Sequence, residues 1–341
     1  MNDATYNALS LTLKRFVDWA HEQGWRYQMA PVHLRHLQRF LQRHGVKQLG
    51  EVNAALLGEY QRRLLVHRSS TTVKGYVATL RALWRYLLNH DLVVEDATRG
   101  LRPLRPAHFV PHLYSPQELS HIEQANRAAI AQVRGPARRW RRQTQHAACA
   151  LLRDCGLRVS EACRLNVTDY DPSTRILHIE RTKFFKTRNI PVPRSTCTLL
   201  THYLKHRHQL VGDAVESPAF FVSKNGRRLR PQALDVHFKG HLCELGLYRP
   251  RRQQGRTVFG STNLHAFRHS FAVRTLERWH SEGRDVERLL PLLSGYLGHV
   301  QVSYTKHYLH LTPTLRQLAS ERFAQVVLFR IDHNATLTDD K

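Results

Sequence analysis

A proline-rich segment after about the first hundred residues most limits how this 341-residue chain can fold. Residues 99–116 read RGLRPLRPAHFVPHLYSP, with four prolines and no helical repeat of apolar residues. Because proline lacks a backbone N–H and interrupts helices and central strands, this stretch does not fit regular structure. It predicts a domain at residues 1–105, a linker at 106–115 and a second domain from residue 116.

Residues 1–105 carry apolar side chains at helical spacing in four segments. These segments are 5–20, Leu34 to Leu41, 54–65 and 72–88. Residues 69–71 are Ser-Ser-Thr and can cap the fourth helix. Apolar residues three or four positions apart form one buried stripe on a helix, so the pattern predicts a compact helical domain.

The pattern from residue 116 onward is mixed. Helices are expected at 116–131, 144–154, 159–165, 195–210, 231–245, 264–280, 285–297 and 300–310. Short strands are expected at 176–180, 189–192 and 220–222, the last before an Asn-Gly turn. The chain is therefore predicted to be mainly α with a small antiparallel β-sheet: a second domain at 116–312, then a C-terminal helix (313–329) and tail within 313–341.

The charge of the chain points to a polyanionic partner. It has 52 Lys+Arg against 27 Asp+Glu, a net charge of +25, and residues 1–110 hold +8 of this excess. Nucleic acid is the usual partner of so basic a chain, and both halves are expected to contact it. No run of 18 apolar residues or secretory signal is evident, and five scattered cysteines fit free thiols. We therefore expect a cytoplasmic, nucleoid-associated protein without a membrane contact.

Several basic residues are candidates for contacts to the DNA backbone. Lys74, Arg81 and Arg85 share one flank of the predicted helix 72–88, although the same flank also fits the wet side of an amphipathic helix. Arginines gather at 134–142, around Trp140, and at 249–256. Both clusters contain Gly or Pro and are interpreted as loops, either against phosphates or in solvent.

Polar groups inside otherwise apolar patterns mark a candidate site. Arg158 lies between a helix that ends at Gly156 and one that begins near Ser160, and its partner is either Glu161 or a phosphate. His265 and Arg268 are three residues apart, hence on one helix face, and suit an anion.

Together these residues resemble the tyrosine recombinases of the phage-integrase family. The resemblance lies in GLRVSE with Arg158, RTKFFKTRNIPV with Lys183, LHAFRHS with His265 and Arg268, LGH with His299, and Tyr308 nine residues beyond His299. Order and spacing match over 115–312, which implies that 116–312 is the catalytic domain. The helical segment 5–105 resembles the family's core-binding domain. Residues 95–97 are Glu-Asp-Ala where the family often has Asn-Pro.

The resemblance implies a reaction and a role for each residue. Tyr308 would attack a DNA phosphodiester, form a 3′-phosphotyrosine and release a 5′-hydroxyl. Arg158 and Arg268 would bind the phosphate oxygens, and Lys183 would protonate the leaving oxygen. His265 and His299 would complete the phosphate shell and assist with the nucleophile's proton. No metal, ATP or other cofactor is expected.

Some assignments have rivals. Lys186 is the alternative general acid, and Lys186 and Arg188 are also candidate DNA contacts in the same hairpin. Tyr304 is the alternative nucleophile, but it follows His299 by only five residues and is expected to pack in the core. Histidine groups such as 202, 206 and 208, or 237 and 241 with Cys243, have ligand-like spacings but complete no four-ligand pattern.

The expected partners are double-stranded DNA recombination sites. The resemblance implies a monomer free in solution and a homo-tetramer on paired sites, with accessory proteins possible. The predicted helix after Tyr308 fits either its own domain or a neighbouring protomer. A catalytically silent DNA-binding protein with this fold and a type IB topoisomerase-like enzyme are the alternatives. The DNA site, the directionality and the integrase, transposase or resolvase role stay open.

Overall fold

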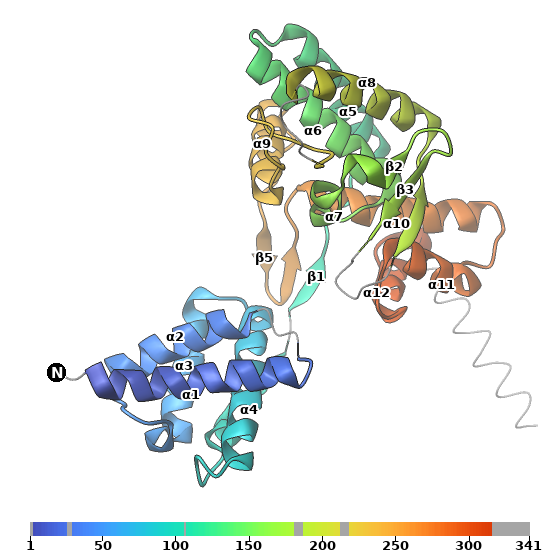
Figure 1. Cartoon of the computed structure of the whole chain (residues 1–341). Helices are drawn as coiled ribbons and strands as arrows, with labels where there is room; N and C mark the ends of the chain where they lie inside the picture. The colour runs from blue at the N-terminus through green and yellow to red at the C-terminus, as the bar shows by residue number, and fades with distance from the viewer. Residues whose placement is uncertain (1–2, 26–28, 106, 181–186, 212–217, 316–341) are drawn as a thin grey trace, which may run out of the picture. The chain divides into compact units, whose positions relative to one another are not determined.

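A division between His108 and Phe109 separates two units of the chain, Met1–His108 and Phe109–Lys341. The computed structural model describes residues 3–25, 29–105, 107–180, 187–211 and 218–315 (Figure 1). The division lies inside the range 106–115, where the sequence predicts a linker. Part of that range is nevertheless regular, because His108–Val110 form a short strand, β1.

In the described residues of the first unit, four helices share one core. They are α1 (Asp3–Glu22), α2 (Ala30–Arg43), α3 (Ala54–His67) and α4 (Ser70–Asn89), with the 3₁₀ turns η1 (Leu49–Glu51) and η2 (Ala97–Gly100). Phe16, Leu37, Leu57 and Trp84 are almost fully buried in this core. Ser69 accepts a hydrogen bond from the Thr72 backbone N–H, which confirms a serine cap at the start of α4.

The second unit is mainly helical, as predicted. Its helices are α5 (Pro116–Gln132), α6 (Pro136–Cys155), α7 (Val159–Arg164), α8 (Arg194–Val211), α9 (Pro231–Glu244), α10 (Leu264–Ser281), α11 (Val286–Leu297) and α12 (Ser303–Lys306), with 3₁₀ turns η3 (Val167–Asp169) and η4 (His307–His310). Helix α6 packs against α5, α8 and α10 (Figure 1). It is therefore the central support of this unit.

The expectation that the arginines around Trp140 form a loop is wrong for Arg138, Arg139, Arg141 and Arg142, which lie in the first turns of α6. This helix begins at Pro136, so Arg134 lies outside it. Proline suits the first turn of a helix, where its missing N–H would have no partner. Trp140 is buried and donates from its indole nitrogen to the Val222 carbonyl oxygen at 3.1 Å. The Gly-Pro pair at 135–136 thus marks a helix start.

The described residues of this unit also form small antiparallel sheets. β2 (Tyr170–Asp171), β3 (Ile176–Ile179) and β4 (Arg188–Pro191) form one sheet, with Leu177 opposite Ile190. β5 (Arg252–Gln254) and β6 (Thr257–Phe259) form a hairpin beside β1, so the second predicted arginine loop is partly regular.

The prediction of a strand at 220–222 is wrong. Within this segment Val222 forms an isolated bridge with Arg228, and the preceding residue Ala219 forms another with Asn166. Phe220 and Phe221 are fully buried, and the Phe220 N–H donates to the Leu165 carbonyl oxygen at 2.7 Å. The apolar run therefore fills the core without a ladder of strand hydrogen bonds.

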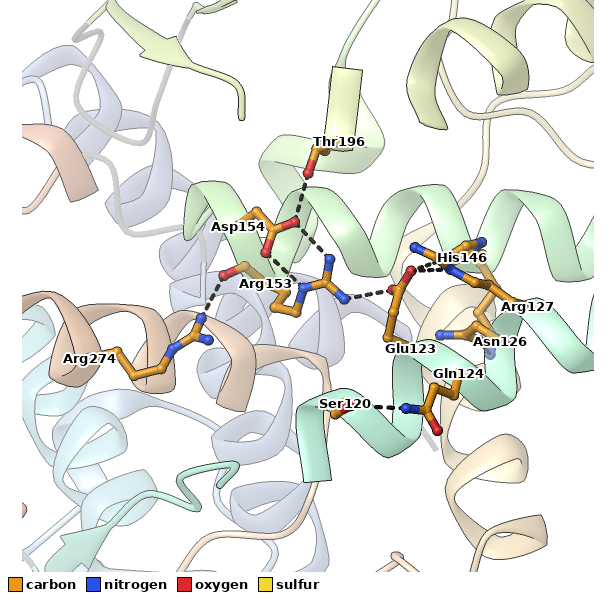
Figure 2. Close-up of polar contacts among 11 residues, drawn as sticks. Ser120, Glu123, Gln124, Asn126, Arg127, His146, Arg153, Asp154, Thr196 and Arg274 are labelled. Carbon is orange, nitrogen blue, oxygen red and sulfur yellow. Dashed lines mark hydrogen bonds and ion pairs between the residues drawn. The ribbon is translucent and has the colours of Figure 1, made fainter. Parts of the chain in front are cut away.

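A polar network ties α6 to its neighbours (Figure 2). Arg153 on α6 pairs with Glu123 of α5 at 2.6 Å and with the adjacent Asp154 at 2.7 Å. Asp154 accepts from the Thr196 hydroxyl of α8, and Arg274 of α10 donates to the Arg153 carbonyl oxygen. Burial raises the Glu123 pKa, but hydrogen bonds and charges from His146 and Arg153 hold it well below its usual range. The network fixes α10, which carries much of the candidate site.

The end of the described chain folds onto its own unit. The helix expected at 300–310 divides into α12 and η4. The Thr312 hydroxyl accepts from the Leu315 N–H at 3.3 Å, and Leu315 is fully buried against α10 and α11. The helix expected at 313–329 lies outside the described residues from 316 onward. In the part of the chain that the structure describes, no helix is long and apolar enough to cross a membrane.

Candidate active site

The turn between α6 and α7 places Arg158. Gly156 ends α6 with φ of 61°, and a Cβ atom there would lie 2.5 Å from the Phe271 ring. Left-handed backbone and this close ring both require glycine. Two residues later, Arg158 is the N-cap residue of α7. The sharp turn thus presents the arginine at a helix start.

Glu161 joins two arginines beneath the site. One of its oxygens accepts from the Arg158 side chain at 2.7 Å, and the other pairs with Arg188 of β4 at 2.8 Å. Only 1% of the Glu161 side chain is exposed. Burial raises the pKa of Glu161, but hydrogen bonding and charge from Arg188 and Arg158 outweigh burial and lower it to about 2. The carboxylate is therefore ionised at neutral pH and fixes both guanidinium groups.

Two further contacts bring Arg158 and Arg268 to one place. Arg158 donates to the Gly298 carbonyl oxygen at 2.8 Å. Arg268 donates to the Gly156 carbonyl oxygen at 2.8 Å and also to that of Leu297. These carbonyls lie at the ends of α6 and α11, where the helix dipole is negative. Burial lowers the pKa of Arg268 to about 10, so it stays charged at neutral pH, and the 29% exposure of Arg158 leaves it open to an anion.

Gly298 is required by the same arrangement. Its φ is 67°, and a Cβ atom would lie 2.8 Å from the Arg188 guanidinium. The glycine ends α11 and lets the chain turn toward His299 while its carbonyl accepts from Arg158. The LGH sequence is thus a structural part of the arginine cluster.

Tyr308 lies on η4, and only 4% of it is exposed. Its hydroxyl lies 3.1 Å from Nδ1 of His269 on α10. The His299 ring stacks nearly parallel to the Tyr308 ring, with centroids 6.3 Å apart, while Nδ1 of His299 contacts the Thr305 hydroxyl at 2.8 Å. Burial raises the pKa of Tyr308, and the charges of Arg268 and Arg158 oppose this effect.

The two tyrosines have opposite environments. Tyr304 is 60% exposed, so the expectation that it packs in the core is wrong. Residues four apart share a face only in a continuous α-helix. Here α12 ends at Lys306 and the tighter η4 turns Tyr308 inward, so the two side chains diverge.

The other predicted site residues lie in different parts of the structure. His265 lies in the first turn of α10, and its ring is edge-on to that of His269 with 4.6 Å between the centroids. Arg188, a candidate DNA contact, has a side chain that is 9% exposed and paired with Glu161. Lys183 and Lys186 lie outside the described residues. Lys74, Arg81 and Arg85 are exposed on α4 of the first unit.

Sequence reasoning missed His269, although a signal was present. It lies four residues after His265 and therefore on the same side of α10.

The histidine groups with ligand-like spacing are not gathered into a metal site in the described residues. His241 contacts Arg142 and Glu244, and no cluster of three ligand residues that could hold a metal occurs among the described residues.

Comparison with known proteins gives consistent matches. The profile of the phage integrase family matches residues 139–314. A predicted integrase/recombinase of Sinorhizobium fredii, y4rB, is 36% identical over 73% of this chain and 76% of its own. The Tn1549 transposon integrase in complex with a circular intermediate DNA has a similar fold, with a TM-score of 0.64 and 17% identity over 91% of this chain and 99% of that one. A lambda integrase dimer bound to a core site has a TM-score of 0.62 and 15% identity over 88% and 76%.

Proposed function

Because the chain belongs to the phage integrase family, we propose that it is a site-specific tyrosine recombinase that cuts and rejoins double-stranded DNA. The observation that carries this proposal is the convergence of Arg158, Arg268 and the buried Tyr308 around the end of α11. Two fixed cations next to a tyrosine suit a phosphodiester that the tyrosine attacks.

We propose that the two arginines stabilise the transition state. As the phenol oxygen of Tyr308 bonds to phosphorus, negative charge grows on the non-bridging oxygens. Guanidinium groups offer planar pairs of donors to such oxygens, and each preorganised donor contributes about 3–4 kcal/mol. Hydrogen bonds to Glu161 and to helix-end carbonyls hold both side chains before DNA binds. This preorganisation supports the role of Arg158 and Arg268.

The remaining roles follow the family resemblance. Lys183, with Lys186 as the alternative, protonates the 5′-oxygen as it leaves. His265 and His299 complete the phosphate shell. The phosphotyrosine conserves the energy of the phosphodiester, so the 5′-hydroxyl of another strand can reseal the DNA without ATP. The proposal requires no metal or other cofactor.

We also propose how the chain binds DNA and assembles. The exposed Lys74, Arg81 and Arg85 contact DNA phosphates, and basic residues of both units contribute. Free chains are monomers, and two of them bind each recombination site, as in the lambda integrase dimer on its core site. Four copies then join two sites, with accessory proteins possible, in the cytoplasm at the nucleoid. Removal of residues 316–341 should spare binding to one site and abolish pairing of two sites.

A mobile element is the biological context that we propose, because the fold resembles that of a transposon integrase and a close sequence relative is a predicted integrase/recombinase. A type IB topoisomerase shares the chemistry but relaxes DNA at dispersed sites without joining two sites. A catalytically silent DNA-binding protein would bind and never cleave. The three candidate functions leave different DNA products, so an experiment that detects these products distinguishes them.

The experiment starts from the full chain and a random pool of DNA duplexes. The duplexes selected by binding are then remade as a series, and each member carries a single nick near a different phosphate. When the protein cleaves next to the nick, a short fragment is released and the protein stays covalently bound to the DNA. A covalent adduct on a denaturing gel, together with exchanged strands between two selected sites, supports recombination. Relaxation of supercoiled DNA without exchange supports a topoisomerase, and binding without an adduct supports a silent protein.

A further inference from the structure

One half-buried histidine contacts the proposed nucleophile but has no role in the reaction described so far. His269 follows Arg268 on α10, and its Nδ1 lies 3.1 Å from the Tyr308 hydroxyl oxygen. The other imidazoles are arranged differently. His299 meets Tyr308 ring against ring and engages Thr305 through Nδ1, and His265 lies edge-on to His269. Of these three imidazoles, His269 is the one with a ring nitrogen at hydrogen-bond distance from the hydroxyl.

The protonation states give this hydrogen bond its direction. Burial, then the charges of His265 and Arg268, lower the pKa of His269 to about 3, so its ring is neutral at pH 7. Burial raises the pKa of Tyr308, so its hydroxyl keeps its proton. A buried O–H needs an acceptor, and neutral imidazole offers one lone pair. We therefore assign Tyr308 as the donor and Nδ1 of His269 as the acceptor, with the ring proton on Nε2.

We propose that His269 is the general base that takes the proton of Tyr308 during DNA cleavage. This inference rests on the recombinase function proposed above. In the step, the phenol oxygen bonds to phosphorus, the bond from phosphorus to the 5′-oxygen breaks, and the phenol proton moves to Nδ1 of His269. The 5′-oxygen receives its proton from the general acid, for which Lys183 is proposed. Resealing reverses both transfers and returns the proton from His269 to Tyr308.

The surroundings of His269 make this base depend on bound DNA. The groups that face it are His265 and Arg268 on α10, His307 on η4, and His299 after α11. Each of these groups lowers the basicity of His269 when it carries a positive charge. A phosphate held by Arg158 and Arg268 would bring negative charge to this cluster and offset part of that effect. His269 thus gains basicity only when the phosphate to be cleaved is in place, and the free enzyme keeps Tyr308 protonated.

The test measures single-turnover cleavage of the selected duplex with sulfur in place of the bridging 5′-oxygen. Because a thiolate leaves without protonation, the rate reports on the nucleophile and not on the general acid. His269→Asn keeps an acceptor oxygen near the position of Nδ1 but cannot hold a proton at neutral pH. His310→Gln, an exposed histidine on the same η4 turn, is the matched control.

We expect His269→Asn to bind DNA within a few-fold of wild type and to cleave about 10²-fold or more slowly at pH 7, the usual scale for losing a general base. Its rate should rise about tenfold per pH unit up to pH 9, because attack then needs a phenol ionised by solvent. Wild type and His310→Gln should lack this steep rise. A mere structural role for His269 would not produce that pH dependence.

Near wild-type cleavage by His269→Asn, with an unchanged pH profile, would overturn the base assignment while leaving the recombinase function intact. Absence of a covalent adduct from wild type would instead overturn the function. If His269→Asn does not fold, wild type is compared in H₂O and D₂O on the same sulfur substrate. A slower rate in D₂O supports proton transfer from Tyr308 in the rate-limiting step, and equal rates contradict it.

Discussion

Arg188 of β4 forms a 2.8 Å ion pair with Glu161 of α7, although 27 residues separate them. Both side chains are largely buried, and Glu161 also holds Arg158. Arg188 comes five residues after Lys183, the proposed general acid. The pair therefore links Arg158, the arginine proposed to bind phosphate, to a residue five positions after the proposed acid.

Loss of this pair should cost both stability and activity. Arg188→Ala leaves the Glu161 carboxylate with one of its two cations, and breaking a buried pair costs about 3–5 kcal/mol. Arg127→Ala is the control, because Arg127 pairs with Glu123 but is 72% exposed, and exposed pairs contribute about 0–1 kcal/mol. Urea unfolding measures the free energy of unfolding of both variants. Equal effects of the two substitutions would contradict the role of Arg188.

Gly298→Ala should lower DNA cleavage by about 10²-fold, the scale for one misplaced transition-state donor, with little change in DNA binding. The new methyl group would meet Arg188 in a backbone conformation that disfavours alanine, and it would disturb the carbonyl that holds Arg158. Gly295→Ala, in α11 with open space around it, is the control and should cleave normally. Cleavage by Gly298→Ala at the control rate would show that the turn does not position the arginines.

The stability of the second unit should fall as the pH falls below about 6.5. The pKa values of His269 and His299 are lowered to about 3 and about 4 in the folded chain, so the unfolded chain binds protons first. Glu161 acts in the same direction at lower pH, because its pKa is lowered from 4.5 to about 2 in the folded chain. This shift corresponds to about 3 kcal/mol of folding stability, which is lost as the pH falls from about 4.5 to about 2. Calorimetry from pH 8 to pH 3 measures the trend. Constant stability over this range would contradict the neutral, half-buried histidines and the buried carboxylate.

DNA binding should weaken steeply with salt. Contacts with on the order of ten phosphates give a log–log slope near −9. Simultaneous alanine substitution of Lys74, Arg81 and Arg85 should make the slope shallower by about 3. Binding to the selected duplex at several salt concentrations measures both values. A wild-type slope shallower than about −3, or no change in the triple variant, would place these charges in solvent.

Long amphipathic helices were the part of the fold that the sequence specified well. Apolar residues at helical spacing located all four helices of the first unit and most of the second. The β5–β6 hairpin was missed because β5 is polar and wholly exposed, so no alternation of apolar residues reveals it. The buried run 220–222 was misjudged because burial on all sides looks the same in a strand and in an irregular segment.

The site shows the same division between local and distant relationships. The Arg158–Glu161 contact spans three residues, and helix geometry predicts it. The partnership of His269 with Tyr308 spans 39 residues and depends on how η4 packs against α10. Periodicity carries no information on that packing. The break between α12 and η4, which separates Tyr304 from Tyr308, was hidden for the same reason.

The most direct test of the proposed reaction is to identify the residue bound to DNA. Wild type, Tyr308→Phe and the matched control Tyr304→Phe are each incubated with the nicked, selected duplex, and the covalent adduct is digested and sequenced by mass spectrometry. Wild type and Tyr304→Phe should carry a 3′-phosphodeoxynucleotide on Tyr308, while Tyr308→Phe should bind the duplex without forming an adduct. An adduct from Tyr308→Phe that is lost in Tyr304→Phe would contradict the assignment of Tyr308 as the nucleophile.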